Sequence, residues 1–107
     1  MVSRIDSLIS ERTKRRRATA VARLSPLLRE LRSAGFDLVV IGSLARQEFK
    51  AHSDVDVLVR APLDTSGRAK VERAVASAMR GSGIAYDLIY AADLTPERLK
   101  EFERDLV

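Results

Sequence analysis

The chain has 107 residues, of which 46% are hydrophobic, and it contains no cysteine. This length suits one small domain with a single core. No apolar run approaches the roughly 20 residues needed to span a membrane, and the N-terminal residues show no secretory pattern, so we expect a cytoplasmic protein. The lack of cysteine excludes a disulfide framework and thiolate chemistry.

Positive charge is concentrated near the N-terminus. The formal net charge is +4, but residues 1–35 alone sum to +6 and the remaining residues to −2. Five of the cations lie within "ERTKRRRAT", residues 11–19. Such a run is typical either of a surface for nucleic acid or an acidic partner, or of a solvated helix face. Because no aromatic residue lies between the cations, as single-strand binding usually requires, the solvated face is favoured.

The N-terminal third predicts two helices. Residues 3–24 carry apolar residues at helical spacing on either side of the basic run. Ser25-Pro26 then suits an N-cap and first helical position, and Gly35 suits the left-handed stop of a second helix. We therefore expect residues 1–24 to form a basic helix, a candidate arm for docking a partner, and residues 25–107 to form the domain proper.

The rest of the chain alternates between strands and helices. "FDLVVIG" (36–42), residues 54–60 and "IAYDLIY" (84–90) read as strands, and "SLARQEF" reads as a short helical turn after the first. "DTSGRAKVERAVASAMRGSG" predicts an amphipathic helix that Gly81 ends, and Thr95-Pro96 predicts the start of a last helix. The alternation indicates an α/β fold with one small sheet packed by helices.

Two aspartates share one face of the second strand. Side chains alternate along a strand, so Asp54 and Asp56 lie about 6.6 Å apart on one face while the valines between and after them face the other way. Two carboxylates this close repel each other unless a cation lies between them. Magnesium typically uses one or two carboxylates together with substrate phosphates. The alternative is that both aspartates guard an exposed edge strand against aggregation.

A third carboxylate, Asp87, fits the same site if the third strand lies beside the second. Three carboxylates on adjacent strands could hold two metal ions, which orient the attacking and leaving oxygens of a phosphoryl or nucleotidyl transfer. As a lone aspartate in a strand, Asp87 is also compatible with a purely structural role.

A phosphate-binding element is predicted just before the aspartates. Gly42 lets the backbone approach a ligand closely, and Ser43 begins a short helical turn whose N–H groups favour anions. Arg46 lies one turn further, where it could reach a triphosphate. Together these residues predict a polyphosphate cradle opposite a metal site.

These residues resemble a known family. Gly42-Ser43, ten intervening residues and Asp54-Val55-Asp56-Val57 look like the signature of the polymerase-beta-type nucleotidyltransferase superfamily. "GSLARQEFKAHSDVDVLV" is similar to the Gly-Ser-x-Ala-Arg-Gly…Ser-Asp-x-Asp pattern of the minimal nucleotidyltransferases. The element order over residues 26–106 agrees with their fold, so the resemblance implies a small three-stranded mixed sheet packed by helices.

The resemblance also implies roles for individual residues. Asp54, Asp56 and Asp87 would be catalytic and hold Mg²⁺, with Asp87 helping to activate the attacking hydroxyl. The residues that would bind ATP are Gly42, Ser43, Arg46 and Ser53. Gln47 departs from the family pattern, which has Gly there, and a side chain at this position is expected to lower catalytic efficiency. His52, the only histidine, is expected to be exposed in the loop before the aspartates.

The acceptor is expected to be another protein, because the chain is too short to include the added domain with which larger members of the superfamily hold their acceptor. Minimal nucleotidyltransferases are commonly encoded beside HEPN ribonuclease toxins, so the resemblance implies an antitoxin that transfers AMP from ATP to a toxin tyrosine. Two alternatives stay open: an antitoxin that neutralises by binding alone, and a stand-alone nucleotidyltransferase acting on a small molecule or nucleic acid.

Overall fold

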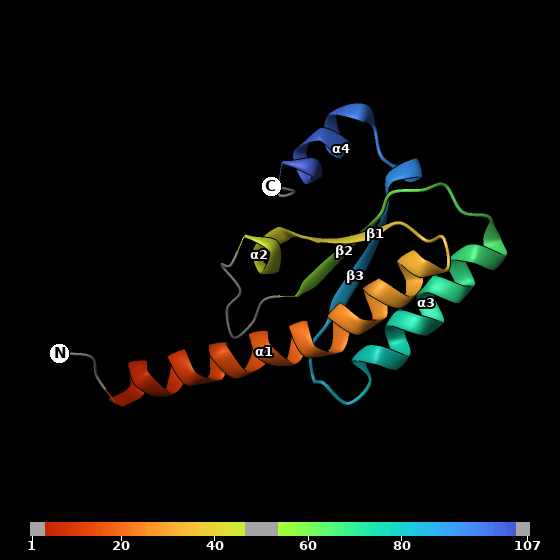
Figure 1. The fold of residues 1–107 in the computed structure, drawn as a ribbon. Coiled ribbons are helices and arrows are strands. Elements are labelled where there is room, and N and C mark those ends of the chain that lie inside the picture. The colour runs from red at the N-terminus through yellow and green to blue at the C-terminus, as the bar shows by residue number, and fades with distance from the viewer. Residues whose placement is uncertain (1–3, 47–53, 105–107) are drawn as a thin grey trace.

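The computed structural model describes residues 4–46 and 54–104, which form helices on both sides of one sheet (Figure 1). The helices are α1 (Arg4–Ser33), α2 (Gly42–Ala45), α3 (Thr65–Met79) and α4 (Pro96–Glu103), with a 3₁₀ turn, η1 (Ala91–Asp93), before the last. The strands are β1 (Leu38–Ile41), β2 (Val55–Val59) and β3 (Tyr86–Tyr90). The predicted alternation of strands and helices is confirmed.

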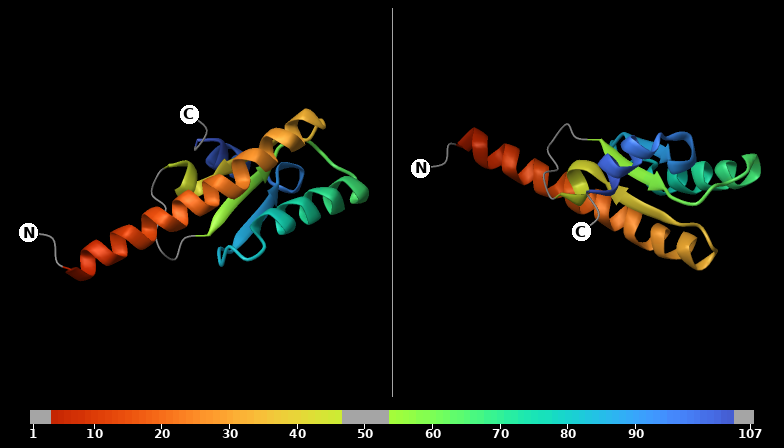
Figure 2. Two further views of the ribbon diagram at one scale, coloured as in Figure 1. Left: turned by 60° about the horizontal axis from the view of Figure 1, so that its bottom comes forward. Right: turned by 90° about the horizontal axis from the view of Figure 1, so that it is seen from above.

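The sheet is small and mixed, as the resemblance implied. Its strand order is β1-β2-β3, with β1 and β2 antiparallel and β2 and β3 parallel. Helices α1 and α3 lie together on one face, and α4 lies on the other (Figures 1 and 2). The two faces of β2 therefore meet different environments.

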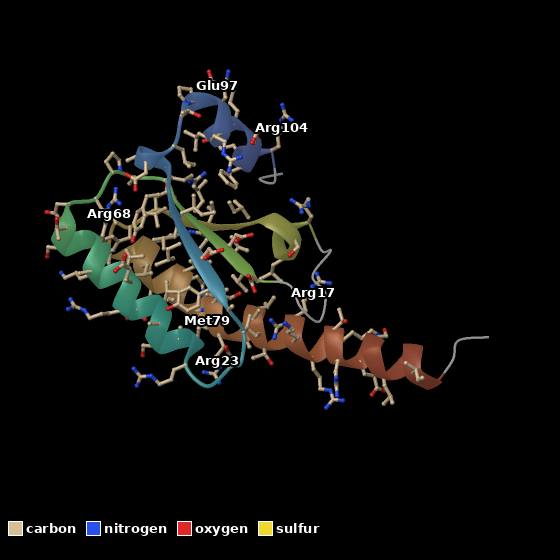
Figure 3. The ribbon with its side chains drawn as sticks, turned by 180° about the vertical axis from the view of Figure 1, so that it is seen from behind. Arg17, Arg23, Arg68, Met79, Glu97 and Arg104 are labelled. Carbon is tan, nitrogen blue, oxygen red and sulfur yellow. The ribbon has the colours of Figure 1, made fainter. Side chains whose placement is uncertain are left out.

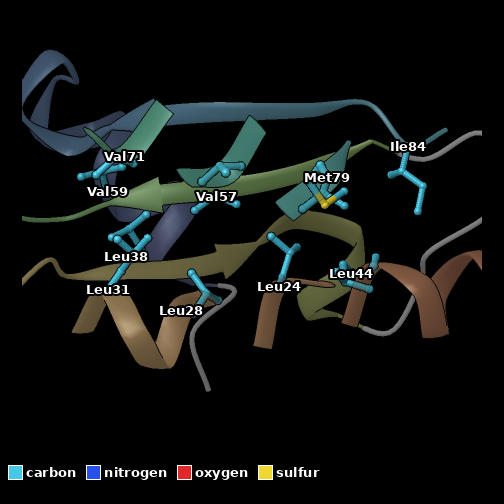
Figure 4. Close-up of a cluster of buried hydrophobic side chains, with 13 residues drawn as sticks. Leu24, Leu28, Leu31, Leu38, Leu44, Val57, Val59, Val71, Met79 and Ile84 are labelled. Atoms are coloured by element: carbon cyan, nitrogen blue, oxygen red, sulfur yellow. The ribbon is translucent and has the colours of Figure 1, made fainter. Parts of the chain in front are cut away.

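The main core lies between the sheet and the α1/α3 layer. The valines of β2 that face this layer, Val55, Val57 and Val59, are at most 1% exposed. Leucines from α1 and Val71, Val75 and Met79 from α3 pack against them (Figure 4). This confirms the predicted valine face. A smaller apolar cluster on the opposite face joins Ile41 and Leu58 to side chains of α4.

Helix α1 runs unbroken through Pro26, so the predicted break at Ser25-Pro26 is wrong. Proline in a helix interior removes one backbone hydrogen bond and disfavours the helix locally. Here the packing outweighs that cost, because one continuous stripe faces the core on both sides of the proline. Its buried members are Ala20, Leu24, Leu28 and Leu31. Gly35, with φ of 95°, follows the helix as predicted.

Replacing Pro26 by alanine is expected to stabilise the protein by about 1–3 kcal/mol, because alanine restores the missing N–H donor and Pro26 itself is exposed. The free energy of unfolding in urea measures the effect. Ser25→Ala at the neighbouring exposed position is the control, with an expected change of about 0.5 kcal/mol or less. A destabilised Pro26→Ala variant would show that the helix needs a kink there.

Two arginines of α1, Arg16 in the basic run and Arg23 beyond it, contact the rest of the domain. The Arg23 guanidinium donates to the carbonyl oxygens of Ala78 and Arg80 at 3.2 and 3.0 Å, and Arg16 donates to Gly83 at 3.2 Å. The end of α3 and the turn after it thus supply acceptors to cations of α1, as helix C-termini commonly do (Figure 3). Within the basic run, Arg16 therefore has a structural contact, whereas Arg12, Lys14 and Arg15 are exposed.

The N-terminal part of α1 extends beyond the sheet (Figures 1 and 2). Ile5 and Leu8 on this part are exposed, and Arg12, Lys14 and Arg15 are exposed in the next turns. Across residues 4–46 and 54–104, none of the helices combines the length and the apolar character that crossing a membrane demands.

A polar cluster fixes the chain between β3 and α4. The Arg68 guanidinium of α3 makes a two-pronged contact with the Asp93 carboxylate, both distances being 2.8 Å, and lies 4.1 Å from the centre of the Tyr90 ring. The Tyr90 hydroxyl donates to Glu72 at 3.2 Å. Thr95 then caps α4 by accepting from the Arg98 N–H, as predicted. The cluster thus ties α3 to the turn that precedes α4.

We expect this cluster to make stability dependent on pH. The hydrogen bonds from Arg68 lower the pKa of Asp93. The ionised carboxylate therefore stabilises the fold at pH values above the ordinary carboxyl pKa, and this stabilisation is lost as pH falls through the lowered pKa. Asp93→Asn should therefore reduce the unfolding free energy at neutral pH, and the difference from wild type should shrink in acid. Urea titrations at several pH values measure it, and a difference that is constant with pH would contradict the expectation.

The contribution of Tyr90 to stability changes with pH in the opposite direction. Burial, then the hydrogen bond to Glu72, raises the pKa of its hydroxyl, so this contribution is full below the ordinary tyrosine pKa and is lost as pH rises through the raised value.

Candidate active site

One pocket on the α4 side of the sheet gathers most of the predicted site residues. Its volume is about 500 Å³, within the usual range for ligand pockets. Its lining comes from the end of β1, from α2, from β2 and β3, and from α4. The lining residues are Ile41, Gly42, Ser43, Arg46, Asp54, Asp56, Asp87, Glu101 and Phe102.

Strand register places two of the aspartates side by side. Asp56 pairs with Ile41 of β1 on one side and with Asp87 of β3 on the other, so the three residues form one row across the sheet. Residues in such a row present their side chains on the same face. Asp54 precedes β2 at the exposed end of the same face. The three carboxylates that the sequence singled out thus line one pocket.

Gly42 lies against the carboxylate of Asp56. Its φ is 74°, in the left-handed region that favours glycine, and a Cβ atom built on it would lie 2.6 Å from Oδ2 of Asp56. Two separate causes therefore require glycine here: the backbone conformation and the carboxylate beside it.

The short helix α2 follows directly on this turn. The Arg46 N–H donates to the Gly42 carbonyl at 3.0 Å and closes the turn, while Leu44 anchors it in the core. The N–H groups of a first helical turn have no acceptor within the helix. Ser43 and Arg46 both line the pocket, so a hydroxyl and a guanidinium accompany these groups. This donor set suits an anionic ligand.

Comparison with known protein families identifies the domain family of the chain. The sequence pattern described as "Nucleotidyltransferase domain" matches residues 21–106. The chain belongs to the nucleotidyltransferase domain family. No curated protein matches it. A nucleotidyltransferase domain implies a nucleoside triphosphate as substrate. The match begins within α1, four residues before the Ser25 at which the sequence predicted the domain to start.

Nucleotidyltransferase domains generally use a divalent metal, and the donors of this pocket fit one. Asp54 and Asp56 supply hard oxygen ligands on one face, and Mg²⁺ needs only one or two carboxylates when phosphates and water complete its shell. In the described part of the chain, no three His, Cys, Asp or Glu side chains converge closely enough to hold one ion. Metal ligation by Asp54, Asp56 and Asp87 stays a prediction.

The sequence missed two residues that line this pocket, Glu101 and Phe102. Phe102 was predicted only as part of the apolar stripe of the last helix, and it does pack in the smaller apolar cluster. The Arg98 guanidinium lies 5.3 Å from its ring centre and 3.4 Å from the Glu101 carboxylate. No local sequence pattern predicts that these residues line the pocket, because their position there depends on how α4 crosses the sheet.

Three positions discussed from the sequence lie outside the described residues. They are Gln47, His52 and Ser53. The predicted nucleotide contact of Ser53, the crowding by Gln47 and the exposure of His52 therefore stay predictions.

Proposed function

We propose that the protein is a Mg²⁺-dependent nucleotidyltransferase that transfers AMP from ATP to a tyrosine of a HEPN-type toxin and thereby acts as its antitoxin. The observation that carries the transferase part is a pocket that the Gly42-Ser43 turn lines together with three carboxylates, Asp54, Asp56 and Asp87. The family match supports the reaction class. The toxin partner rests on the likeness of residues 42–59 to minimal nucleotidyltransferases.

In the proposed reaction the acceptor oxygen attacks the α-phosphorus of the nucleotide. The new oxygen–phosphorus bond forms as the bond to pyrophosphate breaks, and the hydroxyl proton passes to a carboxylate. Ser43, Arg46 and the backbone of the Gly42 turn would hold the phosphates. The metal held by Asp54 and Asp56 would supply charge stabilisation at the attacking and leaving oxygens.

Asp87 is the best-placed proton acceptor. It is exposed and belongs to β3, an edge strand of the sheet formed by the described residues, so a second substrate can approach it from outside. Asp56 lies one strand further in and is half-buried. Asp87 is thus more accessible than Asp56 to an incoming hydroxyl, and access is a geometric requirement for a general base.

Of the predicted arm, residues 1–24, the part of α1 that extends beyond the sheet is our candidate for docking the toxin. Its exposed cations and the exposed Ile5 and Leu8 offer charge and apolar area that the domain's own core does not use. Such a combination suits an acidic, partly apolar partner surface.

The test uses the full chain, ATP labelled in its α-phosphate, Mg²⁺ and the protein encoded by the neighbouring gene. Label is expected on a tyrosine of that protein with wild type and not with Asp54→Ala/Asp56→Ala. No labelling by the wild type would sink the enzymatic proposal. Neutralisation of the toxin that survives loss of both aspartates would instead identify an antitoxin that acts by binding alone.

A further inference from the structure

A second groove meets the nucleotide pocket at Asp87. It has a volume of about 470 Å³ and runs between α3 and β3. Asp87 lines both cavities, and it is the only described residue that the linings of these two share. A nucleotidyl transfer needs two substrates whose reacting atoms meet. If the first pocket holds the nucleotide, as we propose above, the second groove opens on the same carboxylate from the other side.

We propose that this groove and the outer edge of β3 bind an extended polypeptide segment that carries the acceptor hydroxyl. This inference rests on the proposed function, since it names the site of the second substrate. The proposed occupant is a segment of a partner protein that pairs with β3 as a fourth strand.

The backbone of β3 is suited to such pairing. The Val55 N–H donates to the Ala85 carbonyl at 2.9 Å, so Ala85 directs its backbone groups toward β2. Because alternate residues of a strand direct their N–H and C=O groups to opposite sides, Tyr86, Leu88 and Tyr90 direct theirs outward. In the described part of the chain no strand lies on that side. An edge of this kind is a template for strand addition.

Register then places the acceptor. The row Ile41, Asp56, Asp87 crosses the sheet on the pocket face, and an added strand would continue it by one residue beside Asp87. That residue would present its side chain on the same face, with its Cβ about 4.5–5.5 Å from that of Asp87. A hydroxyl at this position would meet both the carboxylate and the nucleotide.

The residues on either side of the acceptor would turn toward α3, because side chains alternate along a strand. There the groove offers room over Ala69 and Ala76, and apolar contact from Tyr86 and Leu88. Small side chains on the helix wall leave space that larger ones would fill.

The charges of the groove favour a polypeptide over a nucleic acid. Glu72 and Asp87 contribute two carboxylates and Arg73 one cation, so the lining is negative on balance. A phosphate backbone is drawn to clustered Lys and Arg, which this groove lacks. A peptide carries few fixed charges and gains main-chain hydrogen bonds at the strand edge.

The chemistry of the step is that of the proposed transfer. The peptide hydroxyl oxygen forms a bond to the α-phosphorus, the bond from phosphorus to pyrophosphate breaks, and the hydroxyl proton goes to Asp87. The nucleoside triphosphate supplies the AMP group, and no oxidant or reductant is required.

The experiment compares Ala76→Arg with Ser77→Arg. Both positions are exposed on α3, but only Ala76 lines the groove. The probes are α-labelled ATP with Mg²⁺ and a library of peptides of about ten residues with a central tyrosine, long enough to form a strand. We expect labelled peptides with wild type and Ser77→Arg, and about tenfold less label with Ala76→Arg, whose side chain obstructs the groove. ATP binding should be equal in all three proteins.

A second measurement does not depend on a variant. Bound acceptor peptide should slow hydrogen exchange of the outward-directed amides of Tyr86, Leu88 and Tyr90, while those of Asp87 and Ile89, directed toward β2, change little. Labelling that Ala76→Arg leaves unchanged, uniform exchange along β3, or ATP binding without transfer to any peptide would each overturn the inference. Failure to bind ATP would overturn the proposed function instead.

Discussion

Replacing Asp56 by asparagine is expected to lower the rate of nucleotidyl transfer by about a hundredfold or more. Asparagine keeps the shape of the side chain beside Gly42 but removes the negative charge that would hold the metal. Asp56 occupies the middle of the row across the sheet, between Ile41 and Asp87, so no neighbouring carboxylate can take its place without moving a strand. The transfer rate with α-labelled ATP measures the effect.

Asp37→Asn is the matched control for this variant. Asp37 accepts from Arg60 at 2.8 Å in an exposed ion pair outside the pocket. The same chemical change there should leave the transfer rate at the wild-type value and cost at most about 1 kcal/mol of stability. If Asp56→Asn transferred nucleotide at the wild-type rate, the carboxylates of this row would have a structural role and not a catalytic one.

The second large effect is expected from Gly42→Ala. The added methyl group would lie 2.6 Å from Oδ2 of Asp56, so the turn or the carboxylate must shift, in addition to the strain of a positive φ. We expect a loss of about 2–4 kcal/mol in unfolding free energy, together with a large loss of nucleotide binding. Urea unfolding and ATP titration measure the two effects separately.

Gly81→Ala separates the strain from the clash. Gly81 has φ of 76°, nearly that of Gly42, but a Cβ atom there would meet nothing within 4 Å. This control should lose only the backbone part, about 1–2 kcal/mol. In an Asp56→Ala background the carboxylate is absent, so Gly42→Ala should then cost about as much as Gly81→Ala. If Gly42→Ala and Gly81→Ala lost the same unfolding free energy in the wild-type background, this would contradict a clash between the added methyl group and Asp56.

The sequence predicted those parts of the site that depend on local periodicity. Alternation along β2 was enough to separate Val55 and Val57 from Asp54 and Asp56, and the same rule placed Asp87 on the pocket face of β3. The glycine turn was predictable because few residue types adopt a positive φ. These inferences use only neighbours in the chain, which the sequence displays directly.

Features that depend on tertiary packing were not predictable in this way. Pro26 is a local signal for a helix start, yet the buried stripe from Ala20 to Leu31 keeps α1 continuous. The contribution of α4 to the pocket is a tertiary feature, and the Arg68–Asp93 contact beside it joins segments 25 residues apart in the sequence. No window of neighbouring residues carries that information.

The mixed pairing of the sheet has a consequence for the order in which the site forms. β1 and β2 pair across one connection, which brings Gly42 to Asp56, whereas β2 and β3 are parallel and pair only after α3 has crossed the sheet. Longer loops cost more entropy to close, so the β3 contact is expected to form later. In a chain emerging from the ribosome, the Gly42 turn would thus be in place beside Asp54 and Asp56 before β3 pairs and brings Asp87 next to Asp56. Transfer activity would therefore indicate that the sheet has finished folding.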